Sequence, residues 1–565
     1  MTQLKTIVYG ILLILLLSSI CPPVASQEGI TWWDKNWLFR QEINLPISTQ
    51  LASAKFQPID IRVSFENNCW TLSENQSSIR VCCWDGNQWQ LLESQIYDMN
   101  FTDDSHIKAC SLVFLIPENA TGKEDYYLYY TDKETSPANY PDHVQVEKTH
   151  YYYEPIPGQK ADFDYYKITD EGYCIYGVGL QGMMMTEYGT QMIFRQSKGQ
   201  KDFSYRYWDR LASFCFQYRD ASLPIGQDTI TTRMKLLSNE IFVDGNLMVQ
   251  FGIVSTNSRE SAKTTDIYKY YYSPIDIKRI CVQVKHEVLK DITVANVEKV
   301  DGEYAFTSGF KTRSEANTFL NTGEILPYIH YYDIDGTTQA VAADTNPTST
   351  ELEWLVSVED NADLGSCPWV SADNGETGKA HALIFSSTNV IKSGTDEQDG
   401  IQIKASQKQE VDIPGLQAYS SGMGCLRNAY NFDGSVDLSI PSDLLVEFDG
   451  EFFTTEINSY KDVQNEAIIF QSLVKYRPLL NGSVSGTETE EKTYSLTVFT
   501  HLARSFPLGS LISAASGKNF SYTYAELYHN GNLISSGVCS RISLIGEFNL
   551  DLKNINIRSI LKLFN

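Results

Sequence analysis

The stretch between residues 360 and 400 holds carboxylates and an imidazole close together in the sequence. His381 lies on a predicted strand, Ala380 to Phe385, and Asp396, Glu397 and Asp399 follow it. A carboxylate and an imidazole on neighbouring strands can act as acid and base on a polysaccharide, because proton transfer needs groups that titrate near neutral pH. These four residues are therefore our candidate catalytic groups.

The same stretch fits two other roles. Asp360 and Asp363 are candidate ligands for Ca²⁺, which binds about six to eight hard oxygen atoms. The Asn-Gly pair at 374 and the Asp-Gly pair at 399 are instead typical of solvated hairpin tips, which is the more frequent role for such residues. We predict no cofactor, with Ca²⁺ as the alternative.

Several local motifs of enzymes are absent from the sequence. The eight histidines form no His-Glu-X-X-His pair, and there is no Gly-X-Ser-X-Gly elbow, phosphate-binding Gly-rich loop with Lys, or Cys-X-X-Cys pair. Asp333-Ile334-Asp335-Gly336 begins like a calcium loop, but an EF-hand needs Gly where this chain has Thr338. We predict a hairpin turn there.

Aromatic residues make up 12% of the chain, including 34 tyrosines. The apolar face of a sugar ring stacks on exposed indole and phenol rings, so such residues are candidates for carbohydrate binding. The competing explanation is that Tyr is a favoured strand residue with one polar edge. The candidates are Trp32, Trp33, Tyr151, Tyr152, Tyr153, Trp208 and Trp369.

Ten of the eleven cysteines follow Cys21, few for this length, so disulfides would reinforce a core without forming the framework. The vicinal pair at 82 and 83 sits on a strand that sends its two thiols to opposite faces. At most one of the two can bridge to a given sheet, with Cys69 or Cys110 as the partner, and the candidates are Cys69, Cys82 and Cys110. Cys367 and Cys425 form a second candidate bridge.

The first 26 residues are typical of a secretory signal peptide. Lys5 precedes an apolar run from 7 to 20, and the small residues Val24-Ala25-Ser26 suit a cleavage site. A membrane helix is the alternative, but the run is shorter than the roughly 20 residues that span a bilayer. We expect a secreted or cell-surface protein with no later transmembrane helix. Sequons for N-glycosylation agree with export, at Asn75, Asn100, Asn119, Asn481 and Asn519.

Short runs rich in Val, Ile, Tyr, Phe and Thr alternate with turn dipeptides throughout the chain. Asp-Gly and Asn-Gly accept the positive φ angles of tight hairpins, and Asp-Gly occurs at residues 85, 244, 301, 335, 399, 433 and 449. The fold class is therefore mainly β, with several antiparallel β-sandwich domains. Breaks in composition place an N-terminal sandwich at 27–136, a large central region of one or two sandwiches at 143–477, and an Ig-like sandwich at 493–565.

The formal net charge is −25 at pH 7. Such an excess of carboxylates opposes binding to a phosphate backbone, so nucleic acid is not an expected partner.

The first quarter of the chain resembles an uncharacterised family of N-terminal β-sandwiches in secreted prokaryotic surface proteins. The resemblance rests on Trp33, Trp37 and Arg40 in a Trp-X-X-X-Trp-X-X-Arg pattern, on the hairpin from Val81 to Gly86, and on the strand Tyr126 to Tyr130. It implies one domain among several and contact with carbohydrate, and it brings no catalytic residues.

These observations predict an exported β-sandwich protein that contacts carbohydrate as a binding or envelope component. One alternative is a polysaccharide lyase or hydrolase with its site in the central region. The other is a purely structural surface-layer or adhesion protein.

Overall fold

The computed structural model divides the chain into two compact units, residues 1–486 and residues 487–565. It describes residues 31–157, 159–181, 191–196, 199–202, 208–218, 220–222, 234–257, 259–294, 306–312, 314–317, 322–351, 353–356, 362–394, 400–410, 415–424, 438–485, 494–499, 523–529 and 532–539. The predicted signal peptide lies outside these ranges. In the second unit, β33 (Tyr494–Phe499), β34 (Thr523–His529) and β35 (Asn532–Cys539) pair antiparallel in a sheet.

The first unit begins with a β-sandwich of two antiparallel sheets. Sheet 1 has the order β31-β1-β7-β3-β4, with β32 also paired to β1, and sheet 2 has the order β2-β6-β5. A short 3-10 helix, η1 (Ala52–Ala54), follows β1. The strands are β1 (Phe39–Asn44), β2 (Pro58–Trp70), β3 (Ile79–Trp84), β4 (Trp89–Leu92), β5 (Ser94–Asp103), β6 (His106–Leu115), β7 (Asp125–Tyr130), β31 (Leu479–Leu480) and β32 (Val484–Ser485).

Strand alternation builds the core of this N-terminal sandwich. Tyr126, Leu128 and Tyr130 of β7 point inward, where they join inward side chains of β2, β3 and β6 in one buried cluster. Leu480 of β31 packs on the same cluster, and the Tyr130 hydroxyl lies 2.7 Å from Ser483 Oγ. Residues 479–485 thus complete a sandwich that begins more than 400 positions earlier in the chain.

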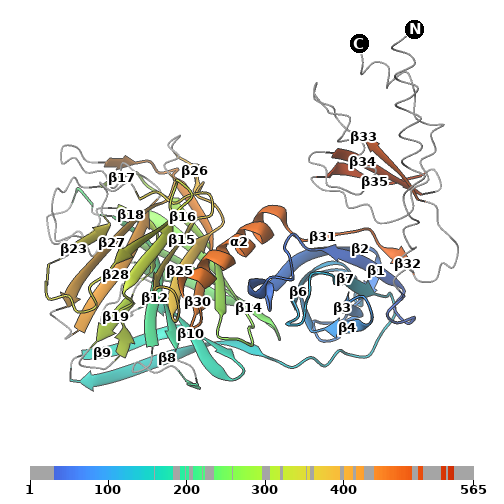
Figure 1. The fold of residues 1–565 in the computed structure, drawn as a ribbon, viewed down its shortest axis with the longest axis horizontal. Helices are drawn as coiled ribbons and strands as arrows, with labels where there is room; N and C mark the ends of the chain where they lie inside the picture. Colours follow the sequence, from blue (N-terminus) through green and yellow to red (C-terminus); the bar gives the residue numbers. More distant parts are fainter. Residues whose placement is uncertain are drawn as a thin grey trace, which may run out of the picture. The chain divides into compact units, whose positions relative to one another are not determined.

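The central region contains two large antiparallel sheets (Figure 1). Sheet 3 runs β20-β19-β28-β18-β12-β11-β10-β9-β8, with β27 on β28 and β23 on β27. These strands are β20 (Thr322–Glu324), β19 (Ser314–Asn317), β28 (Gly415–Gly424), β18 (Phe306–Thr312), β12 (Trp208–Tyr218), β11 (Gln191–Gln196), β10 (Tyr173–Gln181), β9 (Gln159–Asp170), β8 (Val144–Ile156), β27 (Gln402–Glu410) and β23 (Glu353–Val356).

Sheet 4 runs β13-β14-β15-β16-β30-β25-β24-β21-β22, with β26 on β30. Its strands are β13 (Met234–Asp244), β14 (Met248–Asn257), β15 (Ala262–Tyr271), β16 (Lys278–Val288), β30 (Leu445–Thr455), β25 (Ala380–Phe385), β24 (Trp369–Asp373), β21 (Tyr328–Tyr332), β22 (Thr338–Ala342) and β26 (Ile391–Ser393). A separate pair joins β17 (Ile292–Val294) to β29 (Leu438–Ile440).

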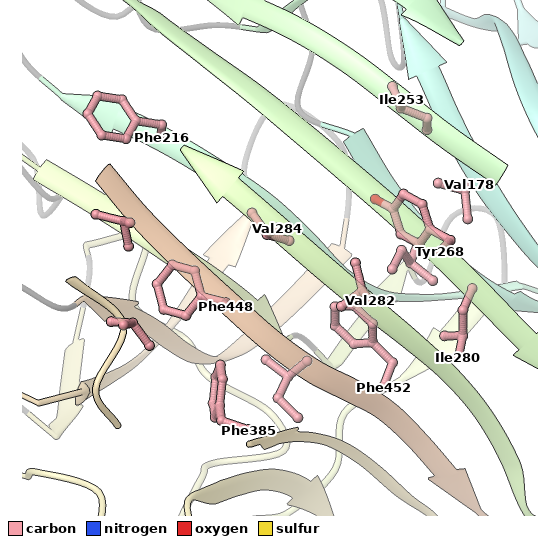
Figure 2. Close-up of a cluster of buried hydrophobic side chains, with 14 of the residues drawn as sticks. Val178, Phe216, Ile253, Tyr268, Ile280, Val282, Val284, Phe385, Phe448 and Phe452 are labelled. Carbon is pink, nitrogen blue, oxygen red and sulfur yellow. The ribbon is translucent and has the colours of Figure 1, made fainter. Parts of the chain in front are cut away.

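Sheets 3 and 4 bury one shared apolar core. Figure 2 shows Tyr268, Val282 and Phe452 of neighbouring strands of sheet 4 within it, together with Val178 and Phe216 of sheet 3. The prediction of a mainly β chain of antiparallel sandwiches is therefore confirmed. The prediction of a hairpin turn at the Asp-Gly pair at 449 is wrong. Asp449 and Gly450 lie inside β30 and pair with β16.

The other face of sheet 4 is covered by helix α2 (Tyr460–Tyr476), which the sequence patterns did not predict. Val463 and Ala467 of α2 pack on Trp369, Ala382 and other residues of β24, β25 and β30. Sheet 4 is thus buried on both faces.

A buried ion pair fastens α2 to this sheet. Arg279 of β16 donates from Nε to Glu466 Oε1 at 2.8 Å and from Nη2 to Oε2 at 2.9 Å, and both side chains are 3% exposed. Gln57, from the N-terminal sandwich, donates to the same carboxylate at 2.6 and 2.7 Å. Three segments far apart in the sequence therefore meet at Glu466.

A second polar contact joins sheet 2 to sheet 4. Asp60 accepts hydrogen bonds from Tyr97, from Lys269 Nζ at 2.8 Å and from Tyr271 at 2.7 Å. Nearby, the Gln95 amide bonds to the backbone of Leu247 and Met248. Gly245 makes room for this amide, because an added Cβ would lie 2.1 Å from Gln95 Nε2.

We expect Glu466→Ala to lower the free energy of unfolding by about 3–5 kcal/mol, because it removes the carboxylate that holds the buried Arg279 guanidinium through two hydrogen bonds. Chemical denaturation measures this. The control is Glu376→Ala, which removes an exposed ion pair with Lys461 and should leave the denaturation midpoint unchanged. Equal midpoints for both variants would contradict the role of Glu466.

His143 forms a third connection between the N-terminal sandwich and the central sheets. Its Nε2 lies 2.8 Å from Glu93, its Nδ1 lies 2.5 Å from Glu171, and its ring stacks on Tyr272 at 4.1 Å. Burial opposes protonation, but the hydrogen bonds to the two carboxylates outweigh it and raise the pKa of His143 above 6.5. The hydrogen bond from His143 lowers the pKa of Glu171 below 4.5.

The stabilisation from this contact should depend on pH. The His143 contribution is complete below pH 6.5 and is lost as the pH rises through the raised pKa, whereas the Glu171 contribution is complete above pH 4.5 and is lost as the pH falls through the lowered pKa. The difference in denaturation midpoint between wild type and His143→Gln should therefore be largest between pH 4.5 and 6.5. His150→Gln, at a side chain that is 55% exposed, is the control. A difference that stays constant with pH would refute this expectation.

Within the described ranges, no helix is both long and apolar enough to cross a bilayer.

Candidate functional site

The outer face of sheet 1 carries a cluster of aromatic rings. Alternation on β7 turns Tyr127 and Tyr129 outward, opposite to the core-facing Tyr126, Leu128 and Tyr130. Trp84 ends β3 and Trp89 begins β4, so the hairpin between them places both indoles on this face. Their ring centroids lie 5.3 Å apart, and Trp89 meets Tyr129 edge to face.

The segment before β1 packs onto this surface. Trp32 meets Tyr129 edge to face at 5.3 Å, and Trp33 lies 5.6 Å from the same ring. Trp37 is buried beneath Trp33 and faces the Arg80 guanidinium at 4.9 Å. We call Trp32, Trp33, Trp37, Trp84, Trp89, Tyr127 and Tyr129 the aromatic face.

Arg40 provides the positive charge within the aromatic face. Its guanidinium lies 4.8 Å from the ring of Trp32 and 4.8 Å from the ring of Tyr127, and it donates to the Tyr129 hydroxyl at 3.3 Å. These contacts orient Arg40 while leaving it partly exposed.

Carboxylates border the same surface. Glu42 of β1 stands opposite Tyr127 and accepts a hydrogen bond from the Asn481 side chain at 2.6 Å. Burial raises the pKa of Asp125, and the neighbouring Glu42 and Glu124 raise it further. The aromatic face therefore has hydrogen-bonding groups of both charges at its edge.

The exposure of the rings decides what this surface can do. Tyr129 and Trp37 are buried, whereas Trp32, Trp33, Trp84 and Trp89 remain partly exposed. The indole N–H groups of Trp32 and Trp89 already donate to backbone carbonyls. These two indoles can offer a flat apolar surface, and hydrogen bonds to a ligand would come from the surrounding charged groups.

The structure separates the other aromatic candidates from this cluster. Tyr152 is 56% exposed on β8, close to Tyr151 and Tyr153 in the central region. Trp208 begins β12, and its side chain lies outside the described part. The prediction that Trp369 binds carbohydrate is wrong, because this residue is fully buried between sheet 4 and α2 and cannot stack on a sugar.

Of the predicted catalytic group, the structure describes only His381. His381 is 4% exposed, on the side of β25 that faces the shared core, so a polymer has no access to it. This position corrects the prediction that His381 acts as an acid or base on a polysaccharide. Asp396, Glu397 and Asp399 lie outside the described residues.

A different imidazole and carboxylate, those of His330 and Asp373, are in hydrogen-bonding contact. His330 Nδ1 lies 2.9 and 3.0 Å from the two oxygens of Asp373, which also accept hydrogen bonds from Ser371 Oγ and Gly375 N. The His330 ring stacks on Tyr460 at 4.0 Å. Asp373 is fully buried, and the His330 side chain is 9% exposed.

No sequence signal pairs these two residues, which are 43 positions apart. The alternation of β24 and β21 could have placed each on a face, but only the order of strands in sheet 4 makes those strands neighbours.

Of the two calcium candidates, the structure describes only Asp363. Asp363 is buried and bridges to Gln402 through the backbone, and Asp360 is outside the described residues. Among the residues that the structure describes, no three His, Cys, Asp or Glu side chains form a group that could hold a metal. The Asp333–Gly336 segment is the predicted hairpin turn between β21 and β22.

The cysteines are free thiols where the structure describes them. Cys82 lies on the aromatic face, whereas Cys69, Cys83 and Cys110 lie in the core of the sandwich. A bridge from Cys82 to Cys69 or Cys110 is thus excluded by strand alternation, which corrects that prediction. Cys367 is partly exposed, and its predicted partner Cys425 lies outside the described ranges.

Four predicted glycosylation sites are exposed, namely Asn75, Asn100, Asn119 and Asn481. Asn519 lies outside the described residues.

Comparison with known proteins gives neither a family nor a sequence relative. No family model matches the chain, and no curated protein matches it.

Solved structures with weak similarity are glycosyl hydrolases. A family 38 protein from Enterococcus faecalis has a TM-score of 0.36 and 8% identity over 89% of this chain and 55% of its own. An alpha-mannosidase from the same species has a TM-score of 0.34 and 9% identity over 88% and 53%. A GH36 alpha-galactosidase from Geobacillus stearothermophilus has a TM-score of 0.26 and 9% identity over 55% and 41%. This chain spans about half the length of the first two, and similarities this low do not bear on its activity.

Proposed function

We propose that this chain is an exported surface protein that binds carbohydrate through the aromatic face of its N-terminal sandwich. The observation that carries the proposal is four partly exposed indoles on one side of sheet 1, with Arg40 and Glu42 beside them. A sugar ring would lie on the indoles while its hydroxyls bond to the charged groups at the edge. The signal-peptide pattern and the exposed sequons support export.

Trp84→Ala should weaken glycan binding by about tenfold, which corresponds to about 1.4 kcal/mol, because it removes one stacking surface. Binding is measured on a glycan array and then by calorimetry with the best ligand. Trp354→Ala, at a tryptophan of the central region that is 40% exposed, is the matched control. Equal binding by both variants, or no glycan signal for the wild type, would contradict the proposal.

A second function, action on a polysaccharide, is favoured by the His330–Asp373 pair. Asp373 fixes the imidazole through Nδ1, which leaves Nε2 to exchange a proton with a substrate hydroxyl or a water. Ser371 bonds to Asp373 and not to His330, so the arrangement suits a general base rather than an activated serine nucleophile.

For this second function, we expect His330→Gln to lower the rate of polysaccharide cleavage by about 10²- to 10⁴-fold, as loss of a general base does. Release of new chain ends from a panel of polysaccharides gives the rate. His106→Gln is the matched control, because His106 also lies 2.9 Å from an aspartate, Asp103, but on a hairpin of the N-terminal sandwich. Absence of cleavage by the wild type would exclude this function.

A further inference from the structure

A lysine and an aspartate meet between the two central sheets. Lys278, the first residue of β16 in sheet 4, places Nζ 2.8 Å from Oδ2 of Asp170, the last residue of β9 in sheet 3. Their side chains are 8% and 4% exposed. The pair therefore spans the interior of the central sandwich without access to bulk water.

The surroundings of Lys278 favour its neutral amine form. Burial lowers the pKa of the Lys278 ammonium, an effect to which Arg195 contributes and which Asp170 and Asp276 only partly oppose. Transfer of one proton from the ammonium to the carboxylate gives an amine and a carboxylic acid with no change in net charge, and burial penalises ions more than neutral groups.

Tyr270 is positioned to polarise the carboxyl group. Its hydroxyl donates to Asp170 Oδ2 at 2.5 Å, and its ring packs edge to face on Tyr176. A donor fixed at a carboxyl oxygen stabilises the negative charge that develops there when a nucleophile adds to the carbon. The backbone carbonyl of Ser273 accepts a hydrogen bond from Lys278 Nζ and so helps to orient the amine.

The chain contains a second lysine–aspartate pair that differs in its exposure and in the direction of the lysine pKa shift. Lys269 Nζ lies at the same distance, 2.8 Å, from Asp60 Oδ2, but the two side chains are 28% and 19% exposed. Burial opposes protonation there too, yet Asp60 and Tyr97 outweigh it and raise the pKa of Lys269. Lys269 therefore remains an ammonium, which has no free electron pair for attack.

We propose that Lys278 and Asp170 condense into an isopeptide bond that cross-links sheets 3 and 4. Within the pair, the Lys278 ammonium passes one proton to the Asp170 carboxylate, and the freed lone pair of Nζ adds to Cγ. The hydrogen bond from Tyr270 stabilises the resulting oxyanion. Nζ then loses a proton, the bond from Cγ to the hydroxyl oxygen breaks, and this oxygen takes up the proton and departs as water. No oxidant, cofactor or second substrate is required.

The bond would close a loop between residues 170 and 278. A cross-link between such distant positions restricts the unfolded chain, which stabilises the folded sandwich.

Peptide mapping of the full-length wild-type protein tests this proposal directly. After denaturation, reduction and trypsin digestion, we expect a branched peptide that contains Asp170 and Lys278, with a mass one water below the sum of its parts. Trypsin should no longer cleave after Lys278. Recovery of two separate peptides, with cleavage after Lys278, would overturn the proposal.

The residue that has lost water must be identified, because Asp-Gly sequences elsewhere in the chain can also lose water by forming a succinimide. Fragmentation of the branched peptide distinguishes the two products, and a water loss confined to Asp-Gly sites counts against the cross-link. Lys278→Met should abolish the branched peptide, Tyr270→Phe should reduce its yield, and Lys269→Met should leave it unchanged. Should Lys278→Met fail to fold, the wild-type map alone still decides the outcome.

Discussion

The structure depends on the burial of sheet 4 on both of its faces. One face shares an apolar core with sheet 3, and the other faces α2 and the N-terminal sandwich. Charged residues of the second face, above all Arg279, must find partners there because a buried ion without a counter-ion is costly. Glu466 supplies the counter-ion for Arg279, and Gln57, from the opposite end of the first unit, donates to the Glu466 carboxylate. The N-terminal sandwich is thus part of the packing of the centre as well as a module in its own right.

This arrangement separates structural from functional polar groups. The interior pairs join strands and sheets, whereas the outer face of sheet 1 leaves indoles and charged groups at the surface. Two further pairs of titratable groups are neither part of the aromatic face nor assigned only to stability. The two pairs are buried to nearly the same degree, with side chains that are 9% and 0% exposed in His330 and Asp373 and 8% and 4% exposed in Lys278 and Asp170.

Strand positions in the N-terminal sandwich followed closely from the sequence. The hairpin predicted from Val81 to Gly86 is the one that joins β3 and β4, because an apolar strand followed by an Asp-Gly turn specifies a hairpin locally. Helix α2 was missed for a physical reason. Its run from Ala467 to Phe470 is apolar at successive positions, and contacts on both sheet 4 and the N-terminal core blur the period of an amphipathic helix.

By itself, the sequence determined the class of the fold and the face of its strand that each side chain takes, since both follow from local periodicity. Only the tertiary structure decided what covers each face. It buried Trp369 under α2, enclosed His381 in the shared core and brought His330 to Asp373. The reason is that strand order in a sheet is set by contacts between distant segments, on which the alternation within a single strand carries no information.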